Sequence, residues 1–169
     1  EPRYLAATQF ESTDARRAFP CWDEPSLKAT FDVTLVVDAG LATISNMQVV
    51  SDTESAPTKR TVHFATTPVM STYLLAFVVG DLASIEDRAD DGTLIRVWAT
   101  RGNEEKGRFA LETSISLLAY FNDYFGIPYP LSKLDHLAIP DFAAGAMENW
   151  GAITYRETAL LVDPEHSSA

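Results

Sequence analysis

Apolar and polar side chains alternate along short segments of the first hundred residues, and this period of two constrains the fold most strongly. Successive side chains of a strand point to opposite faces, so the alternation predicts half-buried β-strands. The alternating segments are Thr30–Val37, Thr61–Ala65 and Leu94–Ala99. Residues 72–79 are continuously apolar, which predicts a short strand buried on both faces. No helical pattern separates these strands, so we expect antiparallel sheets, joined by turns at 38–40, 51–57 and 86–92.

Helical spacing replaces the alternation after residue 100, which predicts a helix over about 104–125. Asn103 is a suitable N-cap, and Glu104 and Glu105 suit the positive end of the helix dipole. Gly126 and the prolines that follow it end the helix. The stripe at helical spacing consists of Phe109, Thr113, Leu117, Tyr120 and Tyr124, widened by Ile115, Leu118 and Phe121.

Two further strands are expected beyond this helix, at Leu134–Ile139 and Ala152–Val162, around a loop at residues 141–151. The change from strands alone to a helix with strands predicts a domain boundary near residue 100. We therefore expect an α+β, mainly β protein, with an antiparallel β domain at 1–100 and an unfinished second domain at 101–169.

The composition excludes several classes of function. The 169 residues carry a net charge of −11, which argues against binding nucleic-acid phosphates but suits a cationic ligand such as a peptide's amino end. The single cysteine, Cys21, cannot form an internal disulfide and is expected to be a small buried side chain. No apolar run approaches the roughly 20 residues of a membrane span. The chain begins at Glu1 without a signal segment or an initiator methionine, so we expect an excerpt of a longer protein.

Several common catalytic motifs are missing from the sequence. It has no glycine-rich phosphate loop, no Gly-x-Ser-x-Gly elbow and no Cys-x-x-Cys pair. His63, His136 and His166 lack the spacing that places two metal ligands on one helical face, so each is expected to be structural or on the surface. A metal site made by this chain alone is therefore not expected.

The segment Gly145-Ala146-Met147-Glu148-Asn149-Trp150-Gly151 combines small residues with a lone carboxylate and an amide. Small side chains over residues 143–146 allow an extended peptide to approach the backbone, and a carboxylate at the end of such a groove would pair with a free ammonium group. That arrangement would select chain ends. On composition alone, a glycine-bounded loop with an ordinary solvated glutamate is the favoured interpretation, and peptide binding is the alternative.

Gly145–Asn149 spells GAMEN, and the sequence resembles the gluzincin zinc aminopeptidases, which carry this exopeptidase signature. Other sequence segments match the family in the same order along nearly the whole chain, and their residues are most similar to those of the puromycin-sensitive branch. These segments are Thr8–Glu11, Asp14–Pro25, Pro68–Leu74, Tyr124–Pro130 and Tyr155–Leu161. The resemblance implies the latter part of an N-terminal β domain followed by the start of a thermolysin-like catalytic domain.

The resemblance also implies roles for individual residues in binding the amino end of a peptide. Glu148 would bind the free α-amine, and Glu11 would share this task with Gln9 alongside. An ammonium group donates up to three hydrogen bonds, and charge-assisted bonds are the strong ones, which explains a pair of carboxylates. Asn149 would hold the segment in place.

The neighbouring positions of the signature would bind the rest of the substrate. The backbone of Gly145 and Ala146 would pair with the substrate's main chain, while Met147, Ala144 and Gln9 would shape the pocket for its first side chain. The peptide substrate and the remainder of the catalytic domain are thus the expected partners.

Zinc is the cofactor that the resemblance implies for the parent protein, held by His-Glu-x-x-His and a further glutamate, with a tyrosine stabilising the tetrahedral intermediate. Residues 1–169 contain neither the zinc motif nor a substitute for it, so the motif's catalytic glutamate and the tyrosine are expected beyond Ala169. We therefore expect a parent enzyme that removes N-terminal residues from peptides, and a 169-residue piece that binds no zinc and is inactive alone.

Alternative functions follow from the same residues. A non-enzymatic, β-rich module that binds peptides or a partner would explain the missing ligands. A glycosidase that uses Glu11 and Glu148 is a weaker reading, which the matching segments disfavour. The resemblance and the lone Cys21 favour a cytoplasmic location.

Charged and aromatic residues near the first motif are expected to be structural. Paired charges commonly position loops, so we expect a buried or half-buried ion network and two core aromatics rather than catalytic groups. The network comprises Arg16, Arg17, Asp23 and Glu24, and the aromatics are Trp22 and Trp150.

Overall fold

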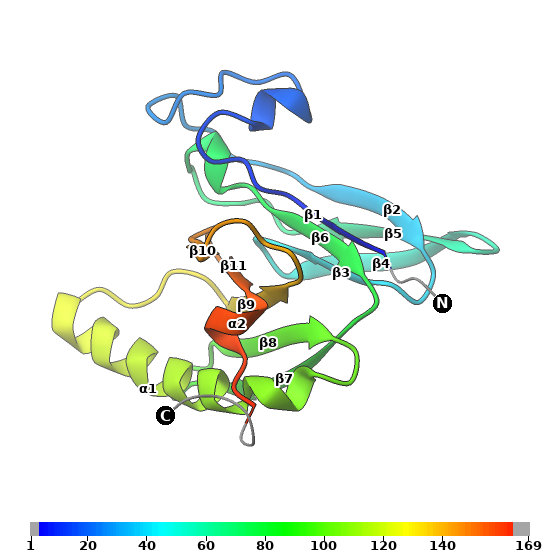
Figure 1. Ribbon diagram of the computed structural model, residues 1–169. Helices are drawn as coiled ribbons and strands as arrows, with labels where there is room; N and C mark the ends of the chain where they lie inside the picture. The colour runs from blue at the N-terminus through cyan, green and yellow to red at the C-terminus, as the bar shows by residue number, and fades with distance from the viewer. Residues whose placement is uncertain (1–3, 164–169) are drawn as a thin grey trace. The chain divides into compact units, whose positions relative to one another are not determined.

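The computed structural model describes residues 4–163, whose helices and strands are labelled in Figure 1. Their contacts divide the chain into two compact units. The first unit extends to Asp81 and includes Glu148–Ala152, and the second consists of Leu82–Met147 and the residues from Ile153 onward.

Strands dominate the first unit, where two three-stranded antiparallel sheets have the orders β1-β6-β3 and β2-β5-β4. Val37, Val62 and Phe64 of the second sheet form a buried cluster against which Val79 of the first sheet packs. The strands are β1 (Leu5–Ala7), β2 (Thr34–Asp38), β3 (Ala42–Ser45), β4 (Val49–Ala56), β5 (Lys59–Phe64) and β6 (Phe77–Gly80), with 3-10 helices at Ala15–Arg17 and Thr72–Leu74.

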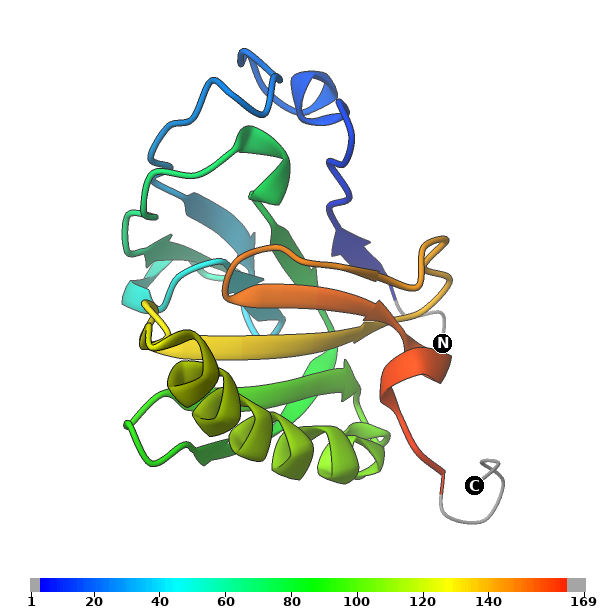
Figure 2. The same ribbon diagram turned by 90° about the vertical axis from the view of Figure 1, so that its left-hand side faces the viewer.

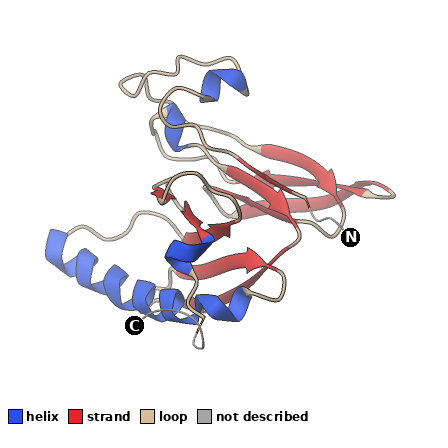
Figure 3. Ribbon diagram, viewed as in Figure 1, coloured by secondary structure: helices blue, strands red, loops and turns tan. Residues whose placement is uncertain are grey.

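The second unit is built on a five-stranded sheet with the order β10-β11-β9-β8-β7. Strands β7 and β8 form an antiparallel hairpin, whereas β8 and β9 are parallel. The long helix α1, blue in Figure 3, lies between β8 and β9 in the chain. Its elements are β7 (Leu82–Arg88), β8 (Leu94–Thr100), a 3-10 helix (Glu104–Gly107), α1 (Arg108–Phe125), β9 (Lys133–Ile139), β10 (Ala146–Met147), β11 (Ala152–Arg156) and α2 (Glu157–Leu160).

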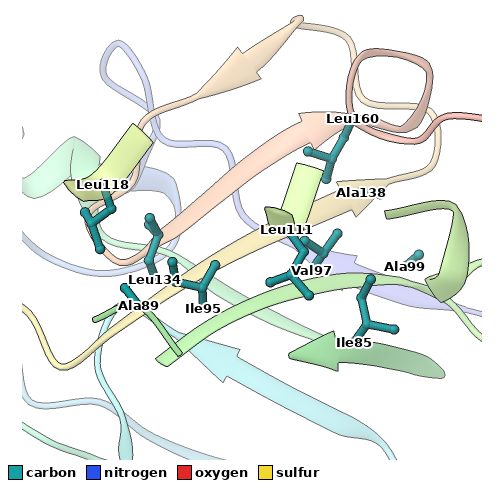
Figure 4. Close-up of a cluster of buried hydrophobic side chains, with 10 residues drawn as sticks. All are labelled: Ile85, Ala89, Ile95, Val97, Ala99, Leu111, Leu118, Leu134, Ala138 and Leu160. Carbon is teal, nitrogen blue, oxygen red and sulfur yellow. The ribbon is translucent and has the colours of Figure 1, made fainter. Parts of the chain in front are cut away.

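Helix α1 lies along one face of this sheet (Figure 2). Leu111 and Leu118 are buried against β8 and β9, in the cluster drawn in Figure 4. At the start of the helix the backbone approaches β8 closely, because a Cβ at Gly107 would lie 2.5 Å from Cγ1 of Val97. The helix ends where predicted, at Gly126, whose φ of 63° is left-handed and suits glycine.

Period-two alternation located several strands correctly. Strands β5, β8 and β9 confirm the predicted positions within two residues, and the Asp-Gly turn joins β7 to β8 as expected. Strand β2 begins four residues later than predicted, at Thr34. The antiparallel sheets and the mainly β character are confirmed.

Three segments differ from the predicted secondary structure. Residues 72–74 form a 3-10 helix, and the strand begins only at Phe77. The apolar side chains of this segment reflect its burial, which does not require an extended backbone. The last predicted strand ends at Arg156, where α2 follows. Residues 51–57 were expected to be a turn but lie largely in β4, whose exposed side chains carry no alternation.

The stripe that predicted helix α1 is mostly exposed in the structure. Leu118 is buried, but Phe109, Leu117, Tyr120, Phe121 and Tyr124 are exposed. The sheet contacts a different side of the helix, on which Leu111 lies. Helical periodicity showed that the chain would form a helix but could not show which of two apolar faces meets the sheet.

The structural interpretation of the charges near the first motif is confirmed for one pair. The buried carboxylate of Asp23 accepts hydrogen bonds from the backbone N–H of Arg16 at 3.0 Å and from its Nε at 3.2 Å. Arg17 instead pairs with Asp14 on the surface, and Glu24 is exposed.

The expected burial of three side chains in these motifs is not observed. Trp22 and Trp150 are 80% and 41% exposed, so neither is a core aromatic, and Cys21 is half-buried. Local sequence shows that a side chain is large and apolar, but its burial depends on which distant residues pack against it.

The compact units divide at Asp81 rather than near residue 100, because β7 and β8 pair with the sheet that contains β9. The predicted boundary at residue 100 coincides instead with the end of β8. The division into family domains stays a prediction. Within residues 4–163, no helix is long and apolar enough to cross a membrane.

A buried charge cluster joins β8 to β9. Asp135, with no exposed surface, accepts hydrogen bonds from Arg96 at 2.6 and 2.9 Å, from Nε1 of Trp98 at 3.1 Å and from Nζ of Lys133 at 2.6 Å. Burial by itself would raise the pKa of the Asp135 carboxyl, but the charges of Lys133 and Arg96 outweigh it and hold this pKa below its ordinary value.

Candidate functional site

The segment predicted to bind substrate contains the edge strand of the five-stranded sheet. Strand β10 consists of Ala146 and Met147, which pair with Tyr155 and Thr154 of β11. The backbone N–H of Arg156 donates to the carbonyl of Gly145 at 3.0 Å, which extends this pairing by one residue. The small residues before Met147 thus lie where the backbone is open to a further strand.

Glu148 follows directly and is exposed between two buried neighbours. Met147 has no exposed surface and Asn149 is 1% exposed. The backbone N–H of Ala152 donates to the carbonyl of Asn149 at 3.0 Å, which closes the turn into β11. Because its neighbours are anchored, the Glu148 carboxylate is presented to solvent from a fixed point of the backbone.

Asn46 anchors the same turn and was not singled out by the sequence. Its Nδ2 donates to the carbonyls of Trp150 and Leu74, each at 2.8 Å, while its Oδ1 accepts from the backbone N–H of Ala76 at 2.9 Å. Asn46 is 1% exposed. A lone asparagine carries no local sign of partners that lie 28 to 104 residues away, so only the tertiary structure reveals this role.

Gln9 and Glu11 flank a buried aromatic anchor, Phe10. The Phe10 ring meets those of Phe19 and Phe77 edge to face, with centroids 6.0 and 6.1 Å apart. Glu11 is exposed and Gln9 is half-buried. Among residues 4–163, the Gln9 side-chain oxygen is one of the buried polar atoms that accept no hydrogen bond, so it is available to an additional donor.

The predicted set is divided between the two compact units. Gln9, Glu11, Glu148 and Asn149 belong to the first unit, and Gly145, Ala146 and Met147 belong to the second. The first unit therefore contains the carboxylates of Glu11 and Glu148 and the side-chain oxygen of Gln9, which accepts no hydrogen bond.

A cavity of about 490 Å³ in the second unit has no predicted site residue in its lining. It lies beside His136, which forms hydrogen bonds with Oγ of Ser114 at 3.0 Å and with the hydroxyl of Tyr155 at 3.1 Å. The Ser114 hydroxyl donates to the Ala110 carbonyl, so it can only accept from Nε2 of His136, and Nδ1 accepts from Tyr155. This arrangement holds the imidazole neutral.

Of the other two histidines, the structure describes only His63. His63 is half-exposed and its Nδ1 forms a hydrogen bond with Oγ1 of Thr34 at 2.8 Å. His63 and His136 thus both have hydrogen-bond partners within the protein, and their structural role stays a prediction. His166 lies outside the described residues.

We expect the His136 arrangement to make stability depend on pH. Burial lowers the pKa of His136 from 6.5 to about 4, against the opposing charge of Asp135. The unfolded chain then binds a proton that the folded chain does not, so stability falls as pH falls through this range. The free energy of unfolding should decrease by about 1 kcal/mol between about pH 7 and pH 5.5.

Urea unfolding of the wild type and of His136→Leu at both pH values measures this contribution. The variant should lack the histidine's share of the decrease, although its stability at neutral pH also changes through packing. An equal pH-dependent decrease in both proteins would contradict the assignment.

The described residues contain no group of three or more His, Cys, Asp or Glu side chains that could hold a metal ion. The histidines and acids described above have other partners or face solvent separately. These described residues therefore do not fit a zinc ion.

Comparison with known proteins identifies the class to which this fold and motif belong. Residues 1–74 match the peptidase M1 N-terminal domain, and residues 109–169 match the peptidase family M1 domain. The chain belongs to peptidase family M1, which confirms the resemblance seen in the sequence.

Individual relatives agree with this assignment over nearly the whole chain. Aminopeptidase M1-A of Oryza sativa subsp. japonica is 52% identical over 169 residues, which are 100% of this chain and 19% of the relative. Puromycin-sensitive aminopeptidase of Caenorhabditis elegans is 55% identical over 163 residues, 96% of this chain and 17% of the relative. Aminopeptidase 2, mitochondrial, of Saccharomyces cerevisiae is 51% identical over 168 residues, which are 99% of this chain and 17% of the relative. The chain thus spans about a fifth of the length of these relatives.

Proposed function

We propose that the chain is the part of a zinc aminopeptidase that binds the free amino end of a peptide substrate. The observation that carries this proposal is the exposed Glu148 between the buried Met147 and Asn149. A carboxylate fixed by its neighbours pairs with an ammonium group without first losing much conformational freedom. The names of the matched relatives, which are aminopeptidases, support the same activity.

The edge strand β10 supports the binding of an extended peptide main chain. Strand β10 is paired with β11 on one side and stands at the end of the sheet order. An extended peptide can add to such an edge through backbone hydrogen bonds. A Cβ placed on Gly145 would meet no atom within 4 Å, so a second backbone has room to approach.

Further acceptors for the ammonium group come from the first unit. We assign Glu11 to share the charge and the unsatisfied oxygen of Gln9 to accept a hydrogen bond. Three acceptors would match the three N–H bonds of an ammonium group. Asn149 holds the turn, while the pocket for the first side chain is assigned to Met147, Ala144 and Gln9.

Peptide-bond hydrolysis in this proposal requires groups outside residues 4–163. The zinc that the family resemblance implies would be held by other residues of the parent protein. The residues of this chain bind and orient the amino end, which restricts cleavage to the first peptide bond. The 169-residue chain by itself is accordingly proposed to be inactive.

We retain a cytoplasmic location as part of the proposal, supported by the single unpaired Cys21. The name of the yeast relative places that protein in mitochondria, so location can differ between relatives. An organelle fractionation of the native protein would distinguish the two compartments.

Blocking the substrate amine tests the proposed function. The longer protein should cleave an aminoacyl substrate with a free α-amine and should cleave its N-acetylated counterpart at least about 100-fold more slowly, because the acetyl group removes the charge-assisted bonds. The measurement is the kcat/KM for both substrates, with the 169-residue chain assayed in parallel. Equal rates for both substrates would contradict amine binding.

The same experiment distinguishes the proposed enzyme from a non-enzymatic binding module. Such a module would bind the free-amine peptide without metal, and the longer protein would release no amino acid. That result would overturn the enzymatic proposal. Cleavage by the 169-residue chain would instead overturn its assignment as an incomplete site.

A further inference from the structure

The turn that follows Glu148 contains a carbonyl whose direction depends on the type of turn. The N–H of Ala152 donates to the carbonyl of Asn149, so Trp150 and Gly151 are the two central residues. Gly151 has a φ of 71°, which at this position is typical of a type II turn. Types I and II differ by a flip of the central peptide, which carries the Trp150 carbonyl. A hydrogen bond to this carbonyl therefore selects one form of the turn.

Asn46, directly after β3, supplies that hydrogen bond and uses its whole amide group in doing so. Its Nδ2 donates to the carbonyls of Trp150 and Leu74 at 2.8 Å each, and its Oδ1 accepts from the N–H of Ala76 at 2.9 Å. The side chain is buried, so it cannot rotate without leaving backbone groups unsatisfied. Asn46 thus fixes the turn against the residues that precede β6.

The start of β6 also holds the segment that contains Gln9. Phe77, one residue after a contact of Asn46, donates its N–H to Oγ1 of Thr8 at 3.1 Å and accepts from the N–H of Thr8 at 3.2 Å. The Phe77 ring meets that of Phe10 edge to face, with centroids 6.1 Å apart. Gln9 lies between Thr8 and Phe10 in the chain. Both parts of the proposed amine site are therefore anchored on adjacent residues of one strand end.

We propose that Asn46 is a positioning residue for ammonium binding, because it fixes the turn after Glu148 relative to the segment of Gln9 and Glu11. The inference rests on the proposed function and deepens it. All four residues belong to the first unit. Three acceptors match one ammonium group only if their separations are fixed, and a misplacement of about 1 Å can lower a rate about 100-fold. Asn46 is buried, so it acts through the turn and not on the substrate.

Asn46→Ala in the longer protein tests the inference. It should lower kcat/KM for a free-amine aminoacyl substrate by about tenfold, mainly through a higher KM, because Glu148 keeps its charge but loses its fixed position. Asn46→Ser retains one polar group and is the milder variant if Asn46→Ala does not fold, with an expected decrease of at least about threefold.

Thr67→Val is the matched control. It removes a buried hydroxyl that accepts from the N–H of Phe31 at 2.9 Å, elsewhere in the first unit. This substitution should lower the stability of the protein, because it also leaves a backbone group unsatisfied, but it should leave kcat/KM unchanged. An equal decrease of kcat/KM in Thr67→Val and Asn46→Ala would overturn the inference.

A double-mutant cycle shows whether Asn46 acts through Glu148. If it does, Asn46→Ala should lower kcat/KM by less than about threefold in a Glu148→Gln background. A tenfold decrease in both backgrounds would contradict the proposed role. An unchanged kcat/KM in Asn46→Ala beside a lowered one in Glu148→Gln would overturn this inference alone. An unchanged kcat/KM in Glu148→Gln would instead refute the proposed function, and the inference with it.

Hydrogen exchange provides a measurement that requires no activity. The Ala152 N–H donates within the turn, so its exchange reports how often the turn opens. Mass spectrometry of the longer protein should show exchange over residues 148–152 that is at least about tenfold faster in Asn46→Ala than in Thr67→Val. Equal exchange in the two variants would show that Asn46 does not fix the turn and would overturn the inference.

Discussion

Glu148→Gln in the longer protein should lower kcat/KM for free-amine substrates by roughly 10- to 150-fold. Glutamine preserves the size of the side chain but removes the charge, and a hydrogen bond to a charged group contributes about 1.5–3 kcal/mol. We expect both a higher KM and a lower kcat, since the amine contact also positions the first peptide bond. Steady-state kinetics with a series of aminoacyl substrates measure the change.

The exposed position of Glu148 allows a strict control. Its replacement should leave the free energy of unfolding unchanged within about 0.5 kcal/mol, because an exposed side chain leaves no cavity. Glu112→Gln, on the exposed surface of α1, is the matched substitution and should change neither kinetics nor stability. An unaltered kcat/KM in Glu148→Gln would refute the assigned role.

Asp135→Asn should lower the free energy of unfolding by about 3–5 kcal/mol. Asparagine has nearly the same shape, so the effect isolates the charge. Its removal leaves Lys133, which is 2% exposed, and the guanidinium of Arg96 without their common counter-charge. Removing one partner from a buried ion pair has a cost of this size because the remaining charge stays desolvated.

Chemical denaturation of the 169-residue chain measures this loss. Asp38→Asn is the control, because Asp38 and Lys59 form an ion pair in which both side chains are about half exposed. That exposed pair should contribute no more than about 1 kcal/mol. A similar loss of stability in both variants would show that the cluster around Asp135 is not desolvated as the structure indicates.

Some strands of this protein could be predicted from the sequence and others could not. In β5 and β8 fully buried side chains alternate with half-buried ones, and this alternation predicted both strands well. Strand β4 is exposed along its whole length, so no alternation revealed it. Burial without alternation was equally misleading at residues 72–74, which form a 3-10 helix within the core.

The candidate site shows a similar division. The small residues and the lone carboxylate of residues 145–149 suggested peptide binding from the residues themselves, and this role stays a proposal. The sequence did not indicate Asn46, because its partners, the carbonyls of Leu74 and Trp150, are distant along the chain. It likewise did not show that the Gln9 oxygen would be buried without a hydrogen bond.

The sequence by itself determined the family, the mainly β architecture and the segment that carries Glu148. These features follow from the local sequence, because hydrophobic periodicity and sequence motifs are properties of residues that are neighbours along the chain. Only the tertiary structure decided which face of α1 meets the sheet, that Asp135 joins β8 to β9, and that Asn46 holds the turn after Glu148. The physical reason is that burial and hydrogen bonding depend on partners that are distant in sequence and become neighbours only when the chain folds.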